Sequence, residues 1–476
     1  MATTVEALAG APVELPEDRL EELRAQLRGS AFGPAERGPA DSHPFNAMYP
    51  DKAAITVRCS GTADVVDAVT FARRQGLLIA VRGGGHSIAG LSSSQGGMLI
   101  DLGAMRGVVV DPERRLAHVQ GGALWGDVDR ETQRFGLATP GGVVSDTGVA
   151  GLTLGGGYGW LRRKYGLSSD NLVAAQVVLA DGRVVTASED QHPDLFWALR
   201  GGGGNFGIVT SFTFRLHPVG PDVGFSATFY PLEELGSVLH GYRDATQAFP
   251  DDVTATIVTM TFPANPELPE AIHDRPVAIV GGVHAGGDPA EGLDVMAPLR
   301  ELATPLFDMS GPTPFVGVQA GFDALFPRQQ LHAYWKSQYV EELSDALIDV
   351  LAARAQTRPA PLTLLNTFHM GGAIARVDPE ATAFADRTSP YMISIDGMWP
   401  DAEQTSRGKA WVRATFDEVS RYGTGGVYLN FTGRDEELTA NVDSAFGRNL
   451  ARLAEVKASY DPENFFRLNN NIAPAA

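Results

Sequence analysis

Val81-Arg82-Gly83-Gly84-Gly85-His86-Ser87 is the stretch from which the rest of this chain can be interpreted. It continues an apolar run, residues 77–82, that predicts a buried strand. Three glycines after a strand let the backbone approach a ligand closely and present several N–H groups to it. The histidine that follows adds a nucleophilic imidazole. Taken alone, the stretch also fits a tight turn that ends in an ordinary polar histidine.

A second glycine-rich segment, residues 139–159, favours the binding loop over the plain turn. Its pattern fits neither a helix nor a strand, and a loop of this length in a compact domain usually has a function. Two such loops can enclose one pyrophosphate group. The glycines of this segment are Gly141, Gly142, Gly148, Gly151, Gly155, Gly156, Gly157 and Gly159.

The segment Gly202-x-Gly204-x-x-Gly207 has the spacing of a dinucleotide-binding fingerprint. A strand-like run, residues 208–212, follows it where that fingerprint requires a helix, so we expect no Rossmann site. The chain also lacks the pattern Gly-x4-Gly-Lys-Ser/Thr. Hydrolysis of nucleoside triphosphates is therefore not expected.

The bulk composition narrows the function further. The chain has 476 residues and a formal net charge of −19, which disfavours binding to nucleic acid. Cys59 is the only cysteine, so we expect a buried structural thiol, no intramolecular disulfide and no multi-cysteine metal or iron–sulfur site. No metal-binding residue is singled out. Residues 1–16 do not resemble a signal peptide, and no apolar stretch reaches 18 residues. These features favour a cytoplasmic enzyme without a membrane span.

The element pattern predicts an α+β fold that changes character near Pro218. Before it, strands and helices alternate and glycines cluster; after it, strand-like runs and helices predict an antiparallel sheet covered by helices. The expected strands are 54–58, 77–82, 97–102, 108–110, 116–119, 171–179, 183–187, 208–216, 254–261, 277–281, 362–369 and 391–399. The expected helices are 16–29, 62–75, 124–135, 194–200, 341–355 and 450–459.

Several segments together resemble one family of flavoenzymes. They are Arg82 to Ser87, Gly151 to Trp160, Arg163 to Asn171, Leu195 to Gly207, Tyr428-Leu429-Asn430-Phe431 and Tyr460 to Asn469. In this order they resemble the berberine bridge enzyme-like FAD-linked oxidases, which belong to the wider vanillyl-alcohol oxidase superfamily. The resemblance implies a split FAD-binding domain of two α/β subdomains, residues 1–218 and 427–476, with a substrate domain, residues 219–426, inserted between them.

The resemblance also implies a covalent bond from His86 to the 8α-methyl group of the flavin. Many relatives add a second bond from a cysteine, but here Val144, flanked by Ser145, occupies that position. We therefore expect FAD held by a single histidyl link. Because a second link tends to accompany open sites for bulky substrates, its absence makes an oligosaccharide substrate less expected.

The same resemblance implies a set of FAD-binding residues. Asn430 and Asn469 are expected to contact the flavin edge, although Asn469 also fits a turn. The full set is Val81, Arg82, Gly83, Gly84, Gly85, Ser87, Gly141, Gly142, Val144, Ser145, Gly148, Val149, Gly151, Gly155, Gly156, Gly157, Gly159, Trp160, Asn171, Gly207, Val209, Asn430 and Asn469. Tyr158 is expected to pack on the cofactor as well.

The catalytic base is less narrowly defined. Relatives place a tyrosine opposite the flavin in the segment that matches Tyr428, which is the first candidate; the alternative is that its ring only packs on the flavin. His369 and Asp396 are weaker candidates. The candidate substrate contacts are Tyr391, Trp399, His369 and Asp396. In the strand 391–399, Tyr391 and Trp399 share one face and Asp396 lies on the other, and the sequence does not tell which face meets substrate.

The resemblance implies hydride transfer from a CH–OH group of a sugar or secondary metabolite, with molecular oxygen as acceptor and hydrogen peroxide as product. Thr147 lies near a position where relatives control oxygen access, and its small size favours an oxidase. Two alternatives stay open, oxidation of a CH–NH or C–H centre and a flavin-binding protein without turnover. A monomer or homodimer is expected.

Overall fold

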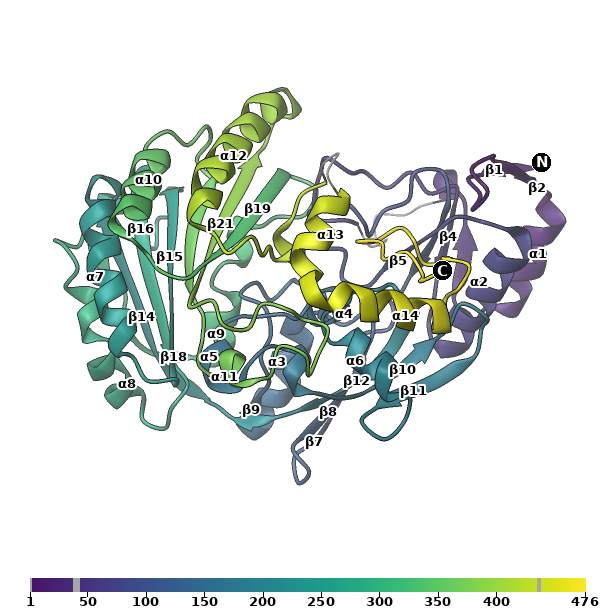
Figure 1. The fold of residues 1–476 in the computed structure, drawn as a ribbon, viewed down its shortest axis with the longest axis horizontal. Helices are drawn as coiled ribbons and strands as arrows, with labels where there is room; N and C mark the ends of the chain where they lie inside the picture. The colour runs from purple at the N-terminus through teal and green to yellow at the C-terminus, as the bar shows by residue number, and fades with distance from the viewer. Residues whose placement is uncertain (1, 37–42, 435–437) are drawn as a thin grey trace.

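The computed structural model describes residues 2–36, 43–434 and 438–476. Two groups of sheets lie side by side (Figure 1). One group carries the first half of the chain and its C-terminal tail, and the other carries residues 222–399. This arrangement agrees with the predicted insertion. The exact boundaries at residues 218 and 426 stay a prediction.

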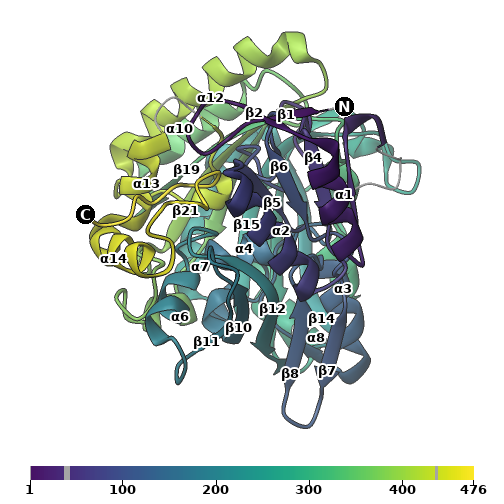
Figure 2. The same cartoon turned by 90° about the vertical axis from the view of Figure 1, so that its right-hand side faces the viewer.

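A four-stranded sheet carries the first glycine loop. Helices α1 (Glu17–Gln26) and α2 (Thr62–Gln75) lie on its outer side (Figure 2). In sheet order its strands are β3 (Ser30–Phe32), β4 (Ile55–Arg58), β6 (Met98–Asp101) and β5 (Ile79–Arg82). The last three are parallel. The chain leaves the carboxyl end of β5 directly into Gly83, as predicted.

A five-stranded antiparallel sheet follows in the first half. Its order is β11 (Val184–Ser188), β10 (Leu172–Val178), β12 (Ile208–Arg215), β8 (Leu116–Gln120) and β7 (Val108–Asp111). Smaller pairs are β1 (Thr3–Val5) with β2 (Val13–Leu15) and β9 (Leu137–Ala138) with β13 (His217–Pro218). The helices of this part are α3 (Trp125–Thr132), α4 (Val149–Leu154), α5 (Arg162–Tyr165) and α6 (Pro193–Leu199).

The inserted part is an antiparallel sheet, as predicted. Its order is β17 (Phe307–Asp308), β14 (Asp222–Pro231), β16 (Arg275–His284), β15 (Val253–Phe262), β20 (Leu364–His369), β21 (Tyr391–Trp399) and β19 (His332–Val340), with β18 (Gly311–Pro314) on β14. Helices α7 (Leu235–Ala248), α8 (Pro289–Val295), α10 (Asp345–Ala355) and α12 (Thr405–Val419) cover one face (Figure 1). Two short helices are α9 (Phe315–Ala320) and α11 (Ala373–Arg376).

The structure shows what each of the two faces of β21 contacts. Tyr391, Ile393 and Trp399 pack in the apolar core beneath α10 and α12. Met392 instead packs with Tyr158 of the first half, so the other face of β21 meets the second glycine-rich segment, residues 139–159. Asp396 shares that face with Met392.

The C-terminal tail returns to the first half of the chain (Figure 1). It contains α13 (Leu438–Phe446) and α14 (Leu450–Tyr460). Lys457 and Asp461, both fully buried, form an ion pair of 2.6 Å. The Lys457 ammonium also donates to the carbonyl oxygens of Asn205 and Phe466, which ties the tail to the first half.

Two sequence predictions need correction. Residues 139–159 were expected to contain no helix, but Val149 to Leu154 form α4, whose buried side chains include Val149 and Leu154. The glycines on either side of this short amphipathic run obscure its helical pattern in the sequence. The helix expected at 341–355 begins only at Asp345, because the Ser344 side chain accepts a hydrogen bond from the backbone N–H of Leu347 and caps it.

Candidate active site

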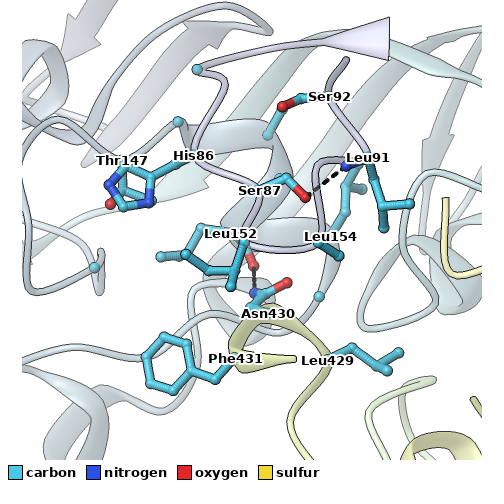
Figure 3. A pocket seen from close by; sticks show the side chains of 18 of the residues that line it. His86, Ser87, Leu91, Ser92, Thr147, Leu152, Leu154, Leu429, Asn430 and Phe431 are labelled. Carbon is cyan, nitrogen blue, oxygen red and sulfur yellow. Dashed lines mark hydrogen bonds between the residues drawn. The ribbon is translucent and has the colours of Figure 1, made fainter. Parts of the chain in front are cut away.

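A cavity of about 320 Å³ lies where the first glycine loop, the second glycine-rich segment, the inserted sheet and the C-terminal tail meet. Figure 3 shows His86 and Thr147 on one part of its wall and Leu152, Asn430 and Phe431 on another. Residues 466 and 468–470 of the tail complete the lining. The cavity is thus assembled from segments far apart in the sequence.

The first and second glycine segments touch backbone to backbone. A Cβ atom on Gly148 would lie 2.5 Å from the backbone nitrogen of Gly84, and one on Gly84 would lie 2.3 Å from the Cα of Gly148. No side chain larger than hydrogen fits either position while both segments keep their places. This close approach brings both segments into the wall of one cavity.

His86 extends from the first loop into the wall of the cavity (Figure 3). Its ring stacks on Phe45, with 4.5 Å between the centroids and 8° between the planes. Its Nε2 atom is buried and has no hydrogen-bond partner among the described residues. Burial, with a smaller effect from the Arg328 charge, lowers the pKa of His86 to about 3, so the imidazole is neutral.

Arg82 was expected to bind FAD, but its side chain pairs with other residues of the protein. Its guanidinium is buried, forms a 2.6 Å ion pair with Asp51 and donates from Nε to the carbonyl oxygen of Ser92. These bonds hold the loop after His86 rather than the cavity, which Arg82 does not line. Its contribution to FAD binding through a direct contact is therefore not supported.

The wall opposite the glycine segments comes from the inserted sheet. Asp396 of β21 has Trp335 of β19 and Leu364 of β20 as its direct cross-strand neighbours. Asn366 pairs in the same way with Val258, and Phe368 with Thr256. All seven residues line the cavity. One face of four neighbouring strands therefore forms a continuous wall.

Asp396 is the only carboxyl group among the described residues that line the cavity. It is 3% exposed, and it accepts hydrogen bonds from the Ser394 hydroxyl and, at 2.7 Å, from the Asn366 side-chain amide. Burial raises the pKa of Asp396 to about 7, and the two hydrogen bonds oppose that rise. The carboxyl can therefore change its protonation near neutral pH.

Tyr428 lines the cavity near the tail. Its hydroxyl accepts a hydrogen bond of 2.8 Å from the Asn430 amide, which also donates to the carbonyl oxygen of Leu152 (Figure 3). Its ring stacks on that of Tyr158 at 4.3 Å. Burial raises the pKa of Tyr428. The phenol is therefore held in its neutral form.

Most of the residues expected at the site do line the cavity. They are Val81, Gly83, Gly84, Gly85, His86, Ser87, Gly142, Val144, Thr147, Gly148, Gly151, Gly155, Tyr158, Trp160, Gly207, Val209, Asp396, Tyr428, Asn430 and Asn469. Others of the expected set lie behind this wall: Arg82, Gly141, Ser145, Val149, Gly156, Gly157, Gly159 and Asn171.

The residues behind the wall support it. Asn171 donates to the carbonyl oxygens of Tyr165 and Leu167, and Ser145 donates to Asp323. Val149 is part of the apolar core. A Cβ atom on Gly141 would lie 2.8 Å from the Trp125 ring, on Gly156 2.6 Å from the Phe384 ring, on Gly157 2.3 Å from Leu152, and on Gly159 2.3 Å from the Gly141 carbonyl oxygen. These positions fix the loop path without facing the cavity.

Three expected substrate contacts are wrong in position. Tyr391 donates to or accepts from the Thr246 hydroxyl at 2.7 Å, and Trp399 donates from Nε1 to the Thr405 hydroxyl, both on the helix-covered side of the sheet. His369 lines a separate cavity together with Arg163 and Tyr391. Burial and the charges of Arg163 and Arg162 lower the pKa of His369 to about 2.

Sequence reasoning missed most of the aromatic wall. The missed residues that line the cavity include Trp335, Phe368, Phe431, Phe322 and Phe326. The alternation of β20 and β21 contained part of the signal, since Asn366 and Asp396 lie on one face, but only the three-dimensional pairing identifies that face. The segment 322–326 carries no such pattern.

The lining fits FAD. Its glycine backbone allows a close approach to phosphates, and the unpartnered Nε2 of His86 offers a nitrogen for a covalent bond. Among the described residues, no group of three His, Cys, Asp or Glu residues is arranged to hold a metal ion. No helix in the described part of the chain is long and apolar enough to cross a membrane.

Known proteins match the chain over nearly its whole length. Residues 53–188 match the model of the FAD binding domain, and residues 427–473 match that of berberine and berberine-like proteins. An FAD-linked oxidoreductase of Bacillus subtilis is 31% identical over 90% of this chain and 92% of its own length. The (R)-6-hydroxynicotine oxidase of Paenarthrobacter nicotinovorans is 28% identical, over 94% and 97%.

Solved structures agree with the sequence matches. The 6-hydroxy-D-nicotine oxidase of Arthrobacter nicotinovorans superposes with a TM-score of 0.83 at 26% identity, covering 94% of this chain and 98% of that one. The berberine bridge enzyme-like protein 1 of Physcomitrella patens gives 0.84 at 25% identity, covering 96% and 99%. The expected fold class is confirmed, and the chain belongs to the berberine bridge enzyme-like family of FAD-linked oxidoreductases.

Proposed function

We propose that this enzyme is an oxidase that holds FAD through a single bond to His86 and takes a hydride from a CH–OH or CH–NH carbon of a small molecule. Oxygen is the proposed acceptor and hydrogen peroxide the product. One observation carries the proposal: an unpartnered imidazole nitrogen on the first glycine loop and a carboxyl on β21 with a pKa of about 7 line the same cavity.

His86 is suited to be the only covalent anchor. Its imidazole is neutral, so the lone pair of Nε2 is free to attack an electrophilic carbon. Val144 lines the cavity where many relatives carry a second linking cysteine. Cys59 is fully buried in the core around α2 and cannot serve as that second anchor without rearrangement of the core.

Asp396 is now the preferred base, ahead of Tyr428. A base must be unprotonated near the working pH, and a carboxyl with a pKa of about 7 meets this condition. The pKa of the Tyr428 phenol lies above its ordinary value, and its oxygen already accepts the Asn430 amide. Tyr428 is therefore proposed to pack against the cofactor and to donate a hydrogen bond.

The chemistry divides between protein and cofactor. FAD supplies the hydride acceptor and returns the electrons to oxygen when bound. Asp396 takes the proton from the substrate O–H or N–H group, and the aromatic wall orients the substrate and excludes water. Thr147, small and on the cavity wall, leaves room for oxygen. Two relatives are named for 6-hydroxynicotine and for monolignols, which supports amines and alcohols as candidate substrates.

Acid denaturation of the purified holoenzyme tests the covalent bond. Flavin absorbance should stay with the precipitated wild-type chain, whereas His86→Ala should release whatever flavin it binds. Thr139→Ala, at the first residue of the second segment but outside the lining, is the control and should keep the flavin attached. Free flavin in the supernatant of wild type would rule out the histidyl link.

Anaerobic mixing with a panel of alcohols, amines and sugars tests the reaction. At least one member should bleach the flavin absorbance, and admission of air should restore it with one hydrogen peroxide per turnover. A panel that leaves the absorbance unchanged would favour a flavin-binding protein without turnover. Restoration by another electron acceptor but not by air would identify a dehydrogenase.

A further inference from the structure

The polar end of the cavity offers hydrogen-bond acceptors. The Asn366 amide nitrogen donates to Asp396, and Asn366 lines the cavity, so its Oδ1 atom is available there as an acceptor. That atom is buried and has no partner among the described residues. The Asp396 carboxylate lies beside it with its own acceptor capacity. A ligand group that meets both residues must therefore bring N–H or O–H donors.

Aromatic rings surround this acceptor pair. Trp335 is the direct cross-strand neighbour of Asp396, and its ring stands edge-on to Phe431 at 5.4 Å. Phe431 in turn lies 5.9 Å from Phe368. Faces of such rings attract cations, most strongly where water is excluded. The wall thus combines the two features that bind an organic ammonium group, a carboxylate and an aromatic enclosure.

Charge supports the same kind of ligand. The described residues that line the cavity include one carboxyl, Asp396, and no lysine or arginine. The whole chain carries a formal charge of −19, and such a field attracts cations to the protein. A sugar would instead need donors and acceptors distributed over the wall, most of which is apolar here. The unpartnered donors among the described lining residues are the indole nitrogens of Trp335 and Trp160 and the hydroxyl of Ser92, on three separate segments of the chain.

We propose that the natural substrate is a protonated arylalkyl amine, whose charged nitrogen binds between Asp396, Asn366 and the Trp335 ring. This assignment rests on the proposed oxidase function and narrows its substrate class. The acceptors bind the N–H groups, the indole face covers the charge, and the Phe368 and Phe431 rings hold the aryl group. A sugar or a neutral alcohol lacks the charge that this end of the cavity is built to match.

The oxidation balances with this substrate. The Asp396 carboxylate removes one proton from the ammonium group, giving the neutral amine and a carboxylic acid. The neighbouring C–H bond then breaks, its hydride leaves for FAD, and the nitrogen lone pair forms the second bond of a protonated imine. Two electrons thus leave the substrate. Oxygen receives them with the hydrogen of the hydride and the proton released by Asp396, which gives hydrogen peroxide and restores the carboxylate.

Two isosteric probes test the assignment without turnover. Cumylamine and cumyl alcohol have nearly the same shape and carry no hydrogen on the carbon that bears nitrogen or oxygen, so neither is oxidised there. Titration of the holoenzyme near pH 8, followed by the change in flavin absorbance, gives both dissociation constants. Cumylamine should bind about tenfold or more tightly than cumyl alcohol, because a buried charged hydrogen bond is the stronger one.

Variants attribute the preference to the site. Asp396→Asn, which keeps the shape, should reduce the preference to within about twofold while cumyl alcohol binds as before. Asp345→Asn removes the same charge from the outer end of α10 and should keep the wild-type preference. Equal binding of both probes by wild type, or a preference that survives in Asp396→Asn, would overturn the assignment.

Failure of the assignment is distinguishable from failure of the oxidase proposal. If sugars or neutral alcohols reduce the flavin efficiently while arylalkyl amines do not, the oxidase proposal stands and the amine assignment falls. If no compound reduces the flavin but cumylamine binds selectively, the ligand class stands and the oxidase proposal falls. Secondary arylalkyl amines should be the fastest reductants of the panel if both are correct.

Discussion

Burial shifts the pKa of His86 and the pKa of Asp396 in opposite directions, but it favours the neutral form of both side chains. Burial lowers the pKa of His86 to about 3 and raises that of Asp396 to about 7, since it disfavours the charged form of each. In the proposed reaction, the neutral imidazole would be ready as a nucleophile. The carboxyl would have a pKa near the pH at which a base is most useful.

The Asp396 carboxyl should set the acid limb of the pH profile. Because its pKa is raised to about 7, it is protonated below that pH, and kcat/KM should fall by about tenfold for each unit of pH below it. Initial rates of peroxide formation between pH 5 and pH 9, with a substrate that does not itself ionise there, measure this limb.

The variant Asp396→Asn should lose the acid limb and reduce kcat by about 10²-fold or more, because proton transfer by a positioned base contributes that much. Tyr428→Phe keeps the ring and should retain the limb. An acid limb that persists in Asp396→Asn and disappears in Tyr428→Phe would return the role of base to the tyrosine.

The Cys59 thiol should be unreactive in the native protein. It is fully buried, and burial raises its pKa, so the thiolate needed for reaction is scarce. A chromogenic disulfide reagent should detect no thiol in the folded holoenzyme and one per chain after unfolding in denaturant. Rapid labelling of the folded protein, at a rate that does not depend on global unfolding, would contradict this prediction. It would show that the core around α2 opens readily.

Individual residues were predictable where a motif names a position. The motif of three glycines and His86 named residues that do line the cavity. The single histidyl link, inferred from the one cysteine, stays a prediction. Asp396 could be recognised only as a weak candidate, since its elevated pKa arises from burial by strands β19 and β20, whose pairing with β21 is not written in the local sequence.

At the scale of elements, the contact between Gly84 and Gly148 should be the most sensitive point of the site. Gly148→Ala places a methyl group 2.5 Å from the Gly84 nitrogen, so the two loops must separate. The variant should bind little flavin and lose roughly 1–3 kcal/mol of unfolding free energy. Flavin absorbance per chain and urea unfolding measure both effects.

Gly236→Ala is the matched control. This glycine lies within α7, and an added Cβ meets only the Ala352 methyl group at 3.9 Å. Alanine favours the helix by about 1 kcal/mol, so this variant should be slightly more stable and bind flavin normally. If both substitutions reduced flavin binding alike, the loop contact would not be the cause.

Elements with a clear period were predicted well, and elements inside glycine-rich sequence were not. The strand 391–399 has the predicted bounds, and its alternation separates two faces. Which face meets the cofactor depends on α12, which covers Trp399, and on Tyr158, which contacts Met392. α4 was missed because its single turn and a half lies between glycines that favour loops.

At the scale of the whole molecule, the buried ion pair Lys457–Asp461 helps to hold the C-terminal tail against the first half of the chain. Lys457→Met leaves a carboxylate without its partner and should cost roughly 3–5 kcal/mol of unfolding free energy. Flavin binding should weaken as well, because Asp461 also accepts the backbone N–H of Phe466, which lines the cavity. Urea unfolding and flavin titration measure the two losses.

Arg183→Met breaks an exposed pair with Asp181 in the same half of the molecule and serves as the comparison. Its cost should not exceed about 1 kcal/mol, since solvent screens such pairs. Equal losses in the two variants would indicate that the tail is held mainly by the apolar packing of α14.

The insertion itself was predicted from the change near Pro218 and the polar tail, but its geometry was not. Helix α14 contacts α6 across some 250 residues of intervening sequence, and no local pattern encodes such a distance. The family resemblance supplied this connection, and the fold shows how it is made.

The participation of residues 466–470 in the cavity wall has a consequence for biosynthesis. A ribosome releases His86 some 380 residues before this segment, so the wall stays incomplete until residues 466–470 have been synthesised and have folded back. Flavin insertion must then wait for this segment, and chains truncated before residue 466 should be colourless however well their first half folds.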